Sequence, residues 1–286
     1  MKANPIFLNQ PKSFWANVRS LSEQLGYTKG GQVTVPTIIE MKAALEALNL
    51  GSLHIVDENG NATELGNALV AYFQFRADQL NQYVSVRLME VERASKTFNQ
   101  LQKKLKPKCP LPMNKQKGAM KAPAYFTGII NMLIEAHADG LPCDYDPRKL
   151  TSVTHGGVPV RTLARRVDGA FPKTVNPIAL WEIKEYYYTT TFGSRVADGV
   201  YETLLDGMEL EELREKERID VKHYLMVDDH NTWWNMGKSY LCRIIDMLHM
   251  GYIDEALFGY EVVERLPEIV GGWVAIEKEK QGGNTH

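Results

Sequence analysis

Apolar residues recur at helical spacing along the first third of the chain. In the earliest such series, each apolar residue follows the last by three or four positions, as on one face of an amphipathic helix. This series is Phe14, Val18, Leu21 and Leu25. The segment Thr-Ile-Ile-Glu at residues 37–40 has the form of a capping box and predicts a second helix that continues to Leu48. A longer apolar series predicts one or two further helices between about residues 63 and 104.

From residue 125 onward, helical spacing alternates with short apolar runs of the kind that form buried strands. The predicted elements are a helix at 125–140, strands at 152–157, 158–169 and 177–187, a helix at 194–217, a strand at 223–229 and a helix at 238–251. This order predicts an α/β (α+β) fold, in which a mixed central sheet is flanked by helices and follows a mainly helical N-terminal region.

A proline-containing segment separates the two patterns. Residues 106–124 hold four prolines and show no periodicity, which is typical of a linker or a functional loop. We therefore predict three parts: a helical N-terminal region at 1–105 for DNA recognition or dimerisation, a basic linker loop at 106–124 and a catalytic domain at 125–286.

Charge is distributed unevenly, although the formal net charge is only −2. Between Glu92 and Glu135 there are eight lysines and no acidic residue, whereas residues 202–220 contain eight acids and three bases. The basic stretch attracts polyanions and the acidic stretch repels them. A phosphate-binding loop and a solvated lysine-rich loop explain the basic stretch equally well. The candidate phosphate-binding residues in the linker are Lys115, Lys117 and Lys121.

Composition and cysteine usage indicate an ordinary globular protein inside the cell. Hydrophobic residues make up 44% of the 286 residues, which is enough for a sizeable core. The first residues lack the apolar core of a signal peptide, and no window approaches 18 consecutive apolar residues. Cys109, Cys143 and Cys242 are widely spaced and odd in number, so we expect reduced thiols. We therefore expect a cytoplasmic protein that does not cross a membrane.

The strongest chemical signal lies near the end of the strand predicted at 177–187. Side chains alternate between the faces of a strand, so Glu182 and Lys184 share one face. Both faces are apolar before Glu182, which is typical of a central strand covered on both sides. Asp168 precedes Glu182 by thirteen intervening residues, enough for a loop that returns the chain in an antiparallel pair. We therefore expect Asp168 to lie beside Glu182.

Two carboxylates beside a lysine suit the hydrolysis of a phosphodiester. The carboxylates form a hard-oxygen site for Mg²⁺, which takes few protein ligands and leaves room for water and a substrate phosphate. Such an ion lowers the pKa of water and polarises the phosphoryl group. Lys184 is placed to orient or deprotonate that water and to stabilise charge on the phosphate.

The pattern of Asp168, thirteen residues and then Glu182-Ile183-Lys184 resembles the motif of the PD-(D/E)xK nuclease superfamily, and within it the type II restriction endonucleases. The resemblance covers roughly residues 125–230 and includes the order of helices and strands. It departs from the family pattern at Val167, where a proline is usual. By position, the resemblance implies a restriction-endonuclease-like core in which Asp168 and Glu182 bind Mg²⁺ and Lys184 is the catalytic lysine.

The resemblance also suggests additional site residues. Sites of this superfamily often include an acid from the first core helix, and Glu135 is the candidate; a solvated helix carboxylate is the alternative. The hydroxyl groups and the guanidinium that follow the strand can donate to DNA phosphates, or the threonines can simply prolong the strand. These residues are Thr189, Thr190, Thr191 and Arg195. Strand alternation places Arg166 with Asp168, where it can form an ion pair with the acids.

The function expected from these features is that of a Mg²⁺-dependent, sequence-specific endonuclease acting on double-stranded DNA. One site per chain can cut both strands only if two copies act together, so we expect a homodimer. A repair or structure-selective nuclease of the same superfamily is one alternative. A non-catalytic DNA-binding or assembly module on a degenerate nuclease fold is the other.

Overall fold

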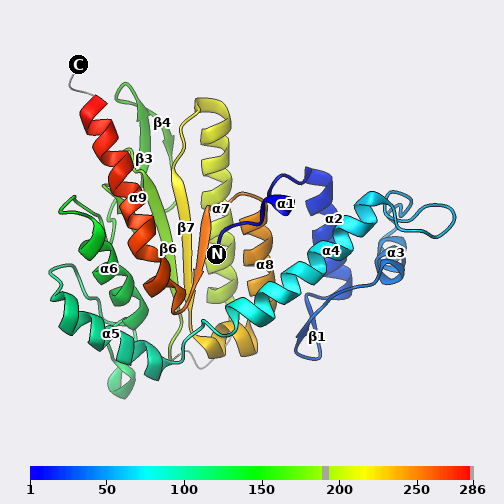
Figure 1. The fold of residues 1–286 in the computed structure, drawn as a ribbon, viewed down its shortest axis with the longest axis horizontal. Helices are drawn as coiled ribbons and strands as arrows, with labels where there is room; N and C mark the ends of the chain where they lie inside the picture. The colour runs from blue at the N-terminus through cyan, green and yellow to red at the C-terminus, as the bar shows by residue number, and fades with distance from the viewer. Residues whose placement is uncertain (189–192, 284–286) are drawn as a thin grey trace.

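The computed structural model describes residues 1–188 and 193–283. Within them the protein is a mixed α/β structure built around a four-stranded sheet (Figure 1), as the sequence pattern predicts. In the order in which they lie in the sheet, the strands are β5 (Gly169–Phe171), β6 (Ala179–Glu185), β7 (Lys222–Asp228) and β8 (Glu255–Phe258). β5 runs antiparallel to β6, whereas β6, β7 and β8 are mutually parallel.

Helices cover both faces of the sheet. One face is covered by α6 (Tyr125–His137) and α9 (Glu261–Gly283), and the other by α7 (Ser194–Glu217) and α8 (Lys238–His249). α7 connects β6 to β7 and α8 connects β7 to β8, as parallel strands require. In β6, Trp181 packs towards α6 and α9, whereas Leu180 packs against Leu210 of α7. This cover on both sides is the reason why the strand is apolar on both faces before Glu182.

Between α6 and β5 the chain forms a separate hairpin. It is formed by β3 (Ser152–His155) and β4 (Val158–Thr162), which pair only with each other in the strand order. The turn contains Gly156 and Gly157, whose φ angles are 56° and 83°. Glycine adopts such left-handed conformations without steric cost, so this pair suits the turn.

The strand predicted at 158–169 is too long. It ends at Thr162, because Leu163 and Val167 turn inwards and pack with residues of α7 in a small apolar cluster. The chain between Thr162 and β5 is irregular, so side chains there do not alternate between two faces. Asp168 lies in this irregular segment, immediately before β5, and not within a strand.

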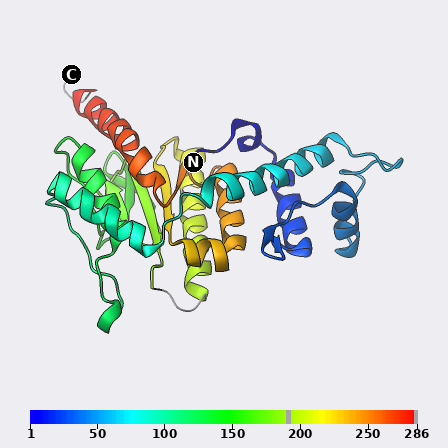
Figure 2. The same ribbon diagram turned by 60° about the horizontal axis from the view of Figure 1, so that its bottom comes forward.

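The N-terminal region is mainly helical, as predicted, and lies at one end of the molecule (Figures 1 and 2). Its elements are α1 (Pro5–Leu8), α2 (Lys12–Leu25), the hairpin of β1 (Thr28–Lys29) and β2 (Gln32–Val33), α3 (Ile38–Ala47), α4 (Glu64–Asp78) and the π-helical segment η1 (Gln79–Val84). The predicted capping box is present, because the side chains and backbones of Thr37 and Glu40 bond reciprocally at the start of α3. Phe14, Leu21 and Tyr72 contribute to a core within this region.

α5 (Val91–Leu105) packs on α6 through Ala94 and Phe98. These contacts make it part of the α/β region of the chain. The sequence pattern had grouped this helix with the N-terminal helices. After α5, the segment that we name the arm (residues 106–124) extends away from the body of the molecule (Figure 2). The arm contains a short 3₁₀ turn, η2 (Gly118–Met120), and a bridge between Met113 and Pro123.

Two elements of the sheet domain lie outside those predicted from the sequence, namely β8 and α9. A π-helical segment, η3 (Asn231–Met236), precedes α8. All three cysteines are free, as expected. Across residues 1–188 and 193–283, we find no helix with both the length and the apolar character needed to cross a membrane.

Candidate active site

The pairing of β5 with β6 brings Asp168 to Glu182. The register places Gly169 opposite Trp181, so the chain already runs beside β6 at Asp168. There the backbone N–H of Asp168 donates to the carbonyl of Trp181 at 3.2 Å and to Oε1 of Glu182 at 3.3 Å. In return, Oδ2 of Asp168 accepts the backbone N–H of Ile183 at 2.8 Å. The structure therefore has the proximity that the sequence predicts.

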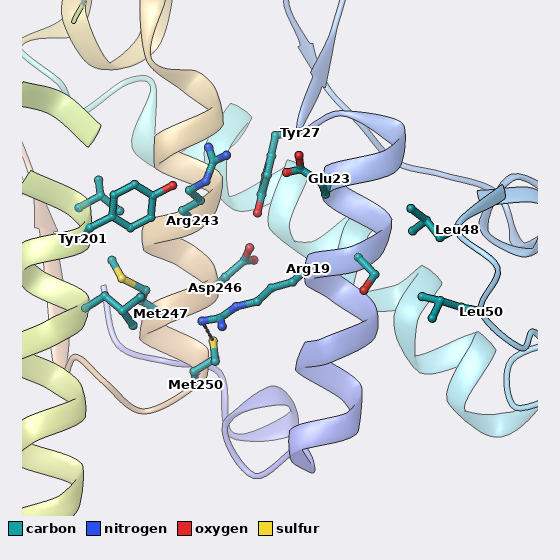
Figure 3. Close-up of a pocket in the computed structure, with 13 residues that line it drawn as sticks. Arg19, Glu23, Tyr27, Leu48, Leu50, Tyr201, Arg243, Asp246, Met247 and Met250 are labelled. Carbon is teal, nitrogen blue, oxygen red and sulfur yellow. Dashed lines mark hydrogen bonds between the residues drawn. The ribbon is translucent and has the colours of Figure 1, made fainter. Parts of the chain in front are cut away.

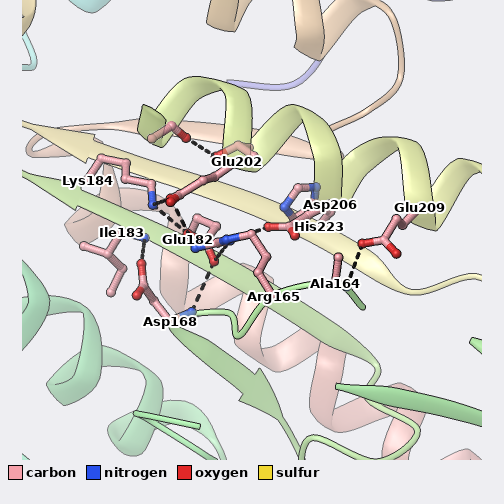
Figure 4. A network of polar contacts seen from close by, with 12 residues as sticks. Ala164, Arg165, Asp168, Glu182, Ile183, Lys184, Glu202, Asp206, Glu209 and His223 are labelled. Atoms are coloured by element: carbon pink, nitrogen blue, oxygen red, sulfur yellow. Dashed lines mark hydrogen bonds and ion pairs between the residues drawn. The ribbon is translucent and has the colours of Figure 1, made fainter. Parts of the chain in front are cut away.

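Glu182 is fully buried and is held between two cations (Figure 4). Its Oε2 accepts a hydrogen bond from Nζ of Lys184 at 2.7 Å. The guanidinium of Arg165 approaches as a fork, with Nη1 at 2.9 Å from Oε1 and Nη2 at 3.2 Å from Oε2. A buried carboxylate stays ionised only with such partners, and the fork adds geometric specificity.

Two further carboxylates reach the same place from α7. Oε2 of Glu202 lies 3.2 Å from both Nζ of Lys184 and Nη2 of Arg165, and Oδ2 of Asp206 lies 2.6 Å from Nη1 of Arg165. Glu202 and Asp206 are four positions apart and therefore share one face of the helix. Gly199 lies one turn earlier, where a Cβ would come within 3.0 Å of Cδ of Lys184. We name the six residues the acidic cluster: Arg165, Asp168, Glu182, Lys184, Glu202 and Asp206.

The acidic cluster contains more carboxyl groups than cations. Burial, followed by the charge of Glu182, raises the pKa of Asp168 to about 6 and that of Asp206 to about 7. Oδ1 of Asp206 is buried and has no hydrogen-bond partner among the described residues. When all four carboxyl groups are ionised, Arg165 and Lys184 leave two negative charges uncompensated. An added divalent cation would balance this excess.

Lys184 is strongly protonated in this arrangement. Burial alone would lower its pKa, but the charges of Glu182 and Asp168 outweigh burial and raise the pKa above its ordinary value. Burial alone would likewise raise the pKa of Glu182, and the ion pairs with Lys184 and Arg165 lower it instead. Lys184 is thus a charged hydrogen-bond donor at neutral pH and is not a ready general base.

The donor set suits Mg²⁺ by its chemistry. Asp168 and Glu182 supply hard oxygens, and Oδ1 of Asp168 accepts no hydrogen bond from the described residues. The side chain of Glu202 is 42% exposed, so the cluster is open to solvent on that side. Within residues 1–188 and 193–283, no group of three or more metal-binding side chains is assembled. Mg²⁺ would therefore depend on the two carboxylates together with water and a substrate phosphate, which is a common arrangement for this ion.

Glu135, the predicted acid from the first core helix, is not brought to the cluster. It lies on α6, which covers the face of the sheet opposite to Glu182. Its Oε2 accepts the backbone N–H of Lys108 at 2.9 Å, at the start of the arm. The acids that do reach the cluster come from α7, because Glu182 faces that helix.

The arginine next to the acids is Arg165 and not Arg166, which is exposed. The prediction for Arg166 assumed strand alternation up to Asp168, and the irregular backbone there removes that alternation. Glu185, which follows Lys184, has a structural role. Its Oε2 accepts the backbone N–H and the hydroxyl of Thr127, both at 3.0 Å, in the first turn of α6.

The predicted DNA-binding residues are not part of the cluster. The lysines of the arm, Lys115, Lys117 and Lys121, are exposed. Arg195 is exposed in the first turn of α7, where its carbonyl accepts the hydroxyl of Tyr186 at 2.9 Å. Thr189, Thr190 and Thr191 lie outside the described residues.

Sequence reasoning missed three members of the cluster: Arg165, Glu202 and Asp206. A signal for the two acids exists in the sequence, because they stand four positions apart in the helix that follows the strand carrying Glu182. That spacing was hidden among the other acids of residues 202–220, most of which are solvated. Nothing in the local sequence distinguishes Arg165 from Arg166.

Comparison with known proteins shows which family the chain belongs to. A family model described as a domain of unknown function (DUF7687) matches residues 89–273, and a second one, also a domain of unknown function (DUF7690), matches residues 1–83. No curated protein and no solved structure matches the chain. The first model spans more than half of the chain and includes the whole acidic cluster, so the protein belongs to the DUF7687 family of domains of unknown function.

Proposed function

We propose that the protein is a Mg²⁺-dependent endonuclease of the PD-(D/E)xK type, which hydrolyses phosphodiester bonds in double-stranded DNA at specific sequences. The observation that carries this proposal is the convergence of Asp168, Glu182 and Lys184 at one edge of the acidic cluster, with an excess of negative charge. A purely structural ion-pair network does not need that excess, since uncompensated buried charge is destabilising.

The residues would divide the work as follows. Asp168 and Glu182 would hold Mg²⁺, which polarises the phosphodiester and makes water more acidic when bound. Lys184, as a charged donor, would stabilise the negative charge that develops on the phosphate. Arg165 would hold Glu182 in position through its two hydrogen bonds. Oε2 of Glu202 contacts both Lys184 and Arg165. A negatively charged phosphate oxygen of the substrate could occupy the same position between the two cations.

The rest of the molecule supports DNA as the substrate. The arm carries exposed lysines, and no acidic residue occurs between Glu92 and Glu135. Such a segment binds the phosphate backbone without reading bases. A homodimer, with one acidic cluster per strand, would cut both strands of a site. A cytoplasmic location, where cellular DNA and reduced thiols occur together, goes with this proposal.

Cleavage of supercoiled plasmid in the presence of Mg²⁺ or Mn²⁺ tests the proposal. We expect Lys184→Ala and Asp168→Asn to lower the cleavage rate about a hundredfold or more, the usual effect of removing a catalytic group. Both variants should fold, because Arg165 still neutralises Glu182 in the first and the asparagine still accepts the Ile183 N–H in the second. Lys216→Ala is the matched control, since this lysine is exposed on α7 and, among the described residues, pairs only with Glu212.

The products separate the alternatives. Linear fragments of fixed length indicate a sequence-specific dimer, whereas cleavage restricted to flaps, junctions or nicks indicates a structure-selective repair nuclease. Duplex binding with no cleavage under any divalent ion indicates a non-catalytic module. Cleavage that survives in Lys184→Ala, or that continues at full rate in excess EDTA, contradicts the proposed site.

A further inference from the structure

A cavity lies between the N-terminal region and the α/β part of the chain, apart from the acidic cluster (Figure 3). It has a volume of about 590 Å³ and is bounded by α2, the end of α3, α7 and α8. Clefts of roughly 300–1,000 Å³ are the usual size of small-molecule sites in proteins. The cavity lies on the side of α7 that faces α8, whereas the acidic cluster lies on the side that faces the sheet.

Two cations line this cavity without an acidic partner. Within the described part of the chain, neither Arg19 nor Arg243 forms an ion pair. Nη2 of Arg19 contacts only Sδ of Met250, at 3.6 Å. The guanidinium of Arg243 lies 4.1 Å from the ring centroid of Tyr27 and 4.9 Å from that of Tyr240, and its Nη1 donates to the carbonyl of Ser239 at 3.2 Å. Its other N–H groups have no hydrogen-bond partner among the described residues. Guanidinium groups that line a concave surface without an acidic partner favour an anionic ligand.

The acids at the cavity do not cancel this charge. Asp246 is already occupied, because both of its oxygens accept from Nη1 of Arg76, at 3.0 and 3.1 Å, and Oδ1 also accepts the hydroxyl of Tyr72. Glu23 is exposed at the rim and forms no ion pair among the described residues. Within the described part of the chain, the cavity therefore presents two cations and one carboxylate that form no ion pair, which leaves one positive charge in excess.

The remaining walls are aromatic and apolar. Tyr201, 51% exposed on α7, and Tyr27, after α2, lie on either side of Arg243 (Figure 3). Leucine and methionine side chains complete the lining. Tyrosine rings stack on flat aromatic groups, and the polarisable sulfur of methionine makes favourable contacts with aromatic rings.

We propose that this cavity binds a nucleotide, with the phosphate on Arg19 and Arg243 and the base against the exposed ring of Tyr201. The combination of unpaired guanidinium groups, tyrosine walls and a volume suited to one small molecule carries the proposal. It does not depend on the nuclease activity, because the site is separate from the acidic cluster and its occupancy is measured by binding alone.

Isothermal titration of the full chain with AMP, GMP, CMP and UMP tests the proposal, with inorganic phosphate and adenosine as separate arms. We expect at least one nucleotide to bind with a submillimolar Kd, about tenfold or more tighter than phosphate or adenosine, because only the nucleotide uses both parts of the site. Arg19→Gln and Arg243→Gln should each weaken that binding about tenfold, the usual effect of losing one charge-assisted hydrogen bond. Lys216→Gln, outside the cavity, should leave it unchanged.

Should Arg243→Gln fail to fold, Arg19→Gln and Tyr201→Ala carry the test, since both positions are exposed. The proposal is overturned if no nucleotide binds at millimolar concentration. It is also overturned if phosphate alone binds equally well, or if the substitutions leave nucleotide affinity intact. Protection of Arg19 by a DNA duplex in the absence of any nucleotide binding would assign the cavity to a DNA-binding surface instead.

Discussion

Asp228 is a buried carboxyl group outside the acidic cluster. It ends β7, on the face of the sheet covered by α6 and α9, and its Oδ1 accepts the backbone N–H of Met89 at 2.7 Å. The hydroxyl of Tyr187 bonds to its other oxygen. Burial raises the pKa of Asp228 to about 8, with a smaller contribution from Glu185, and outweighs these hydrogen bonds. The group is therefore neutral in the folded protein at pH 7 and ionised in the unfolded chain.

We predict that Asp228→Asn becomes more stable than the parent protein as the pH rises. Between about pH 4 and pH 8 the folded state binds one more proton than the unfolded state at this position, so the parent loses up to about 1.4 kcal/mol of unfolding free energy per pH unit. Asparagine does not titrate, so it removes this pH dependence of the unfolding free energy, and it can still accept the Met89 N–H. Urea unfolding at pH 5, 6, 7 and 8 checks this, and parallel pH profiles for the two proteins would show that Asp228 is ionised in the folded state.

Three members of the acidic cluster were predictable from the sequence, because a simple rule of strand geometry places each of them. Strand alternation links Glu182 with Lys184, and the length of the loop before them places Asp168 alongside. Arg165 was not predictable, because its position depends on a backbone that leaves the strand at Thr162. Glu202 and Asp206, the partners of Arg165 on α7, were not predictable either. They reach the cluster because their face of the helix packs on the sheet, and long-range packing determines that face.

The pairing of β5 with β6 depends on a residue that has no side chain. Gly169 lies against the indole of Trp181, and a Cβ at this position would come within 2.0 Å of Cε2 of that ring. Trp181 cannot withdraw easily, since it is fully buried and stacks on Trp273 at 5.5 Å with an interplanar angle of 8°. The close approach fixes Asp168, one residue earlier, beside Glu182.

We predict that Gly169→Ala lowers the free energy of unfolding by about 1 to 3 kcal/mol, as overpacking of a core usually does. If the proposed function holds, the same change should lower plasmid cleavage, because it displaces Asp168. Gly271→Ala is the matched control: this residue lies in α9 with no atom within 4 Å of an added Cβ, and alanine favours a helix. Chemical unfolding measures both variants, and equal stability of the two would contradict the contact.

Among the elements, those with strong local signals were predictable. α3 has a capping box, α6 and α7 have helical spacing, and β6 and β7 are apolar runs. β8 was not predictable, because it has only four residues and all of them are buried, so no alternation of apolar and polar positions marks it. α9 contains Pro267 and a glycine pair, which argue against a helix locally, and its packing on α6 overrides them.

At the scale of the whole molecule, a buried ion pair joins the N-terminal region to the α/β part. Arg76 of α4 is fully buried, and its Nη1 lies 3.0 Å from Oδ2 of Asp246 on α8. The hydroxyl of Tyr72 also donates to Asp246, and the hydroxyl of Ser22 accepts from Arg76. The two regions matched by separate family models therefore share one polar core, and we expect them to unfold together.

We predict that Asp246→Asn destabilises the protein by about 3 to 5 kcal/mol, because it leaves the charge of Arg76 buried without a counter-ion. The double variant Arg76→Met/Asp246→Asn should recover much of this loss, since the remaining pair is uncharged and Tyr72 still donates to the asparagine. Thermal unfolding of the three proteins checks the ranking. A double variant no more stable than the single one would mean that the charge is not the cause.

Successive turns of α7 contribute residues to both the acidic cluster and the cavity. Glu202 and Asp206 point to the acidic cluster, while Val200 and Leu204 line the cavity towards α8. One inserted or deleted residue turns the rest of an α-helix by about 100°. A single such change between positions 200 and 202 would therefore displace residues of both the acidic cluster and the cavity. Substitutions can alter either set of contacts alone, whereas a change of length at this point alters both.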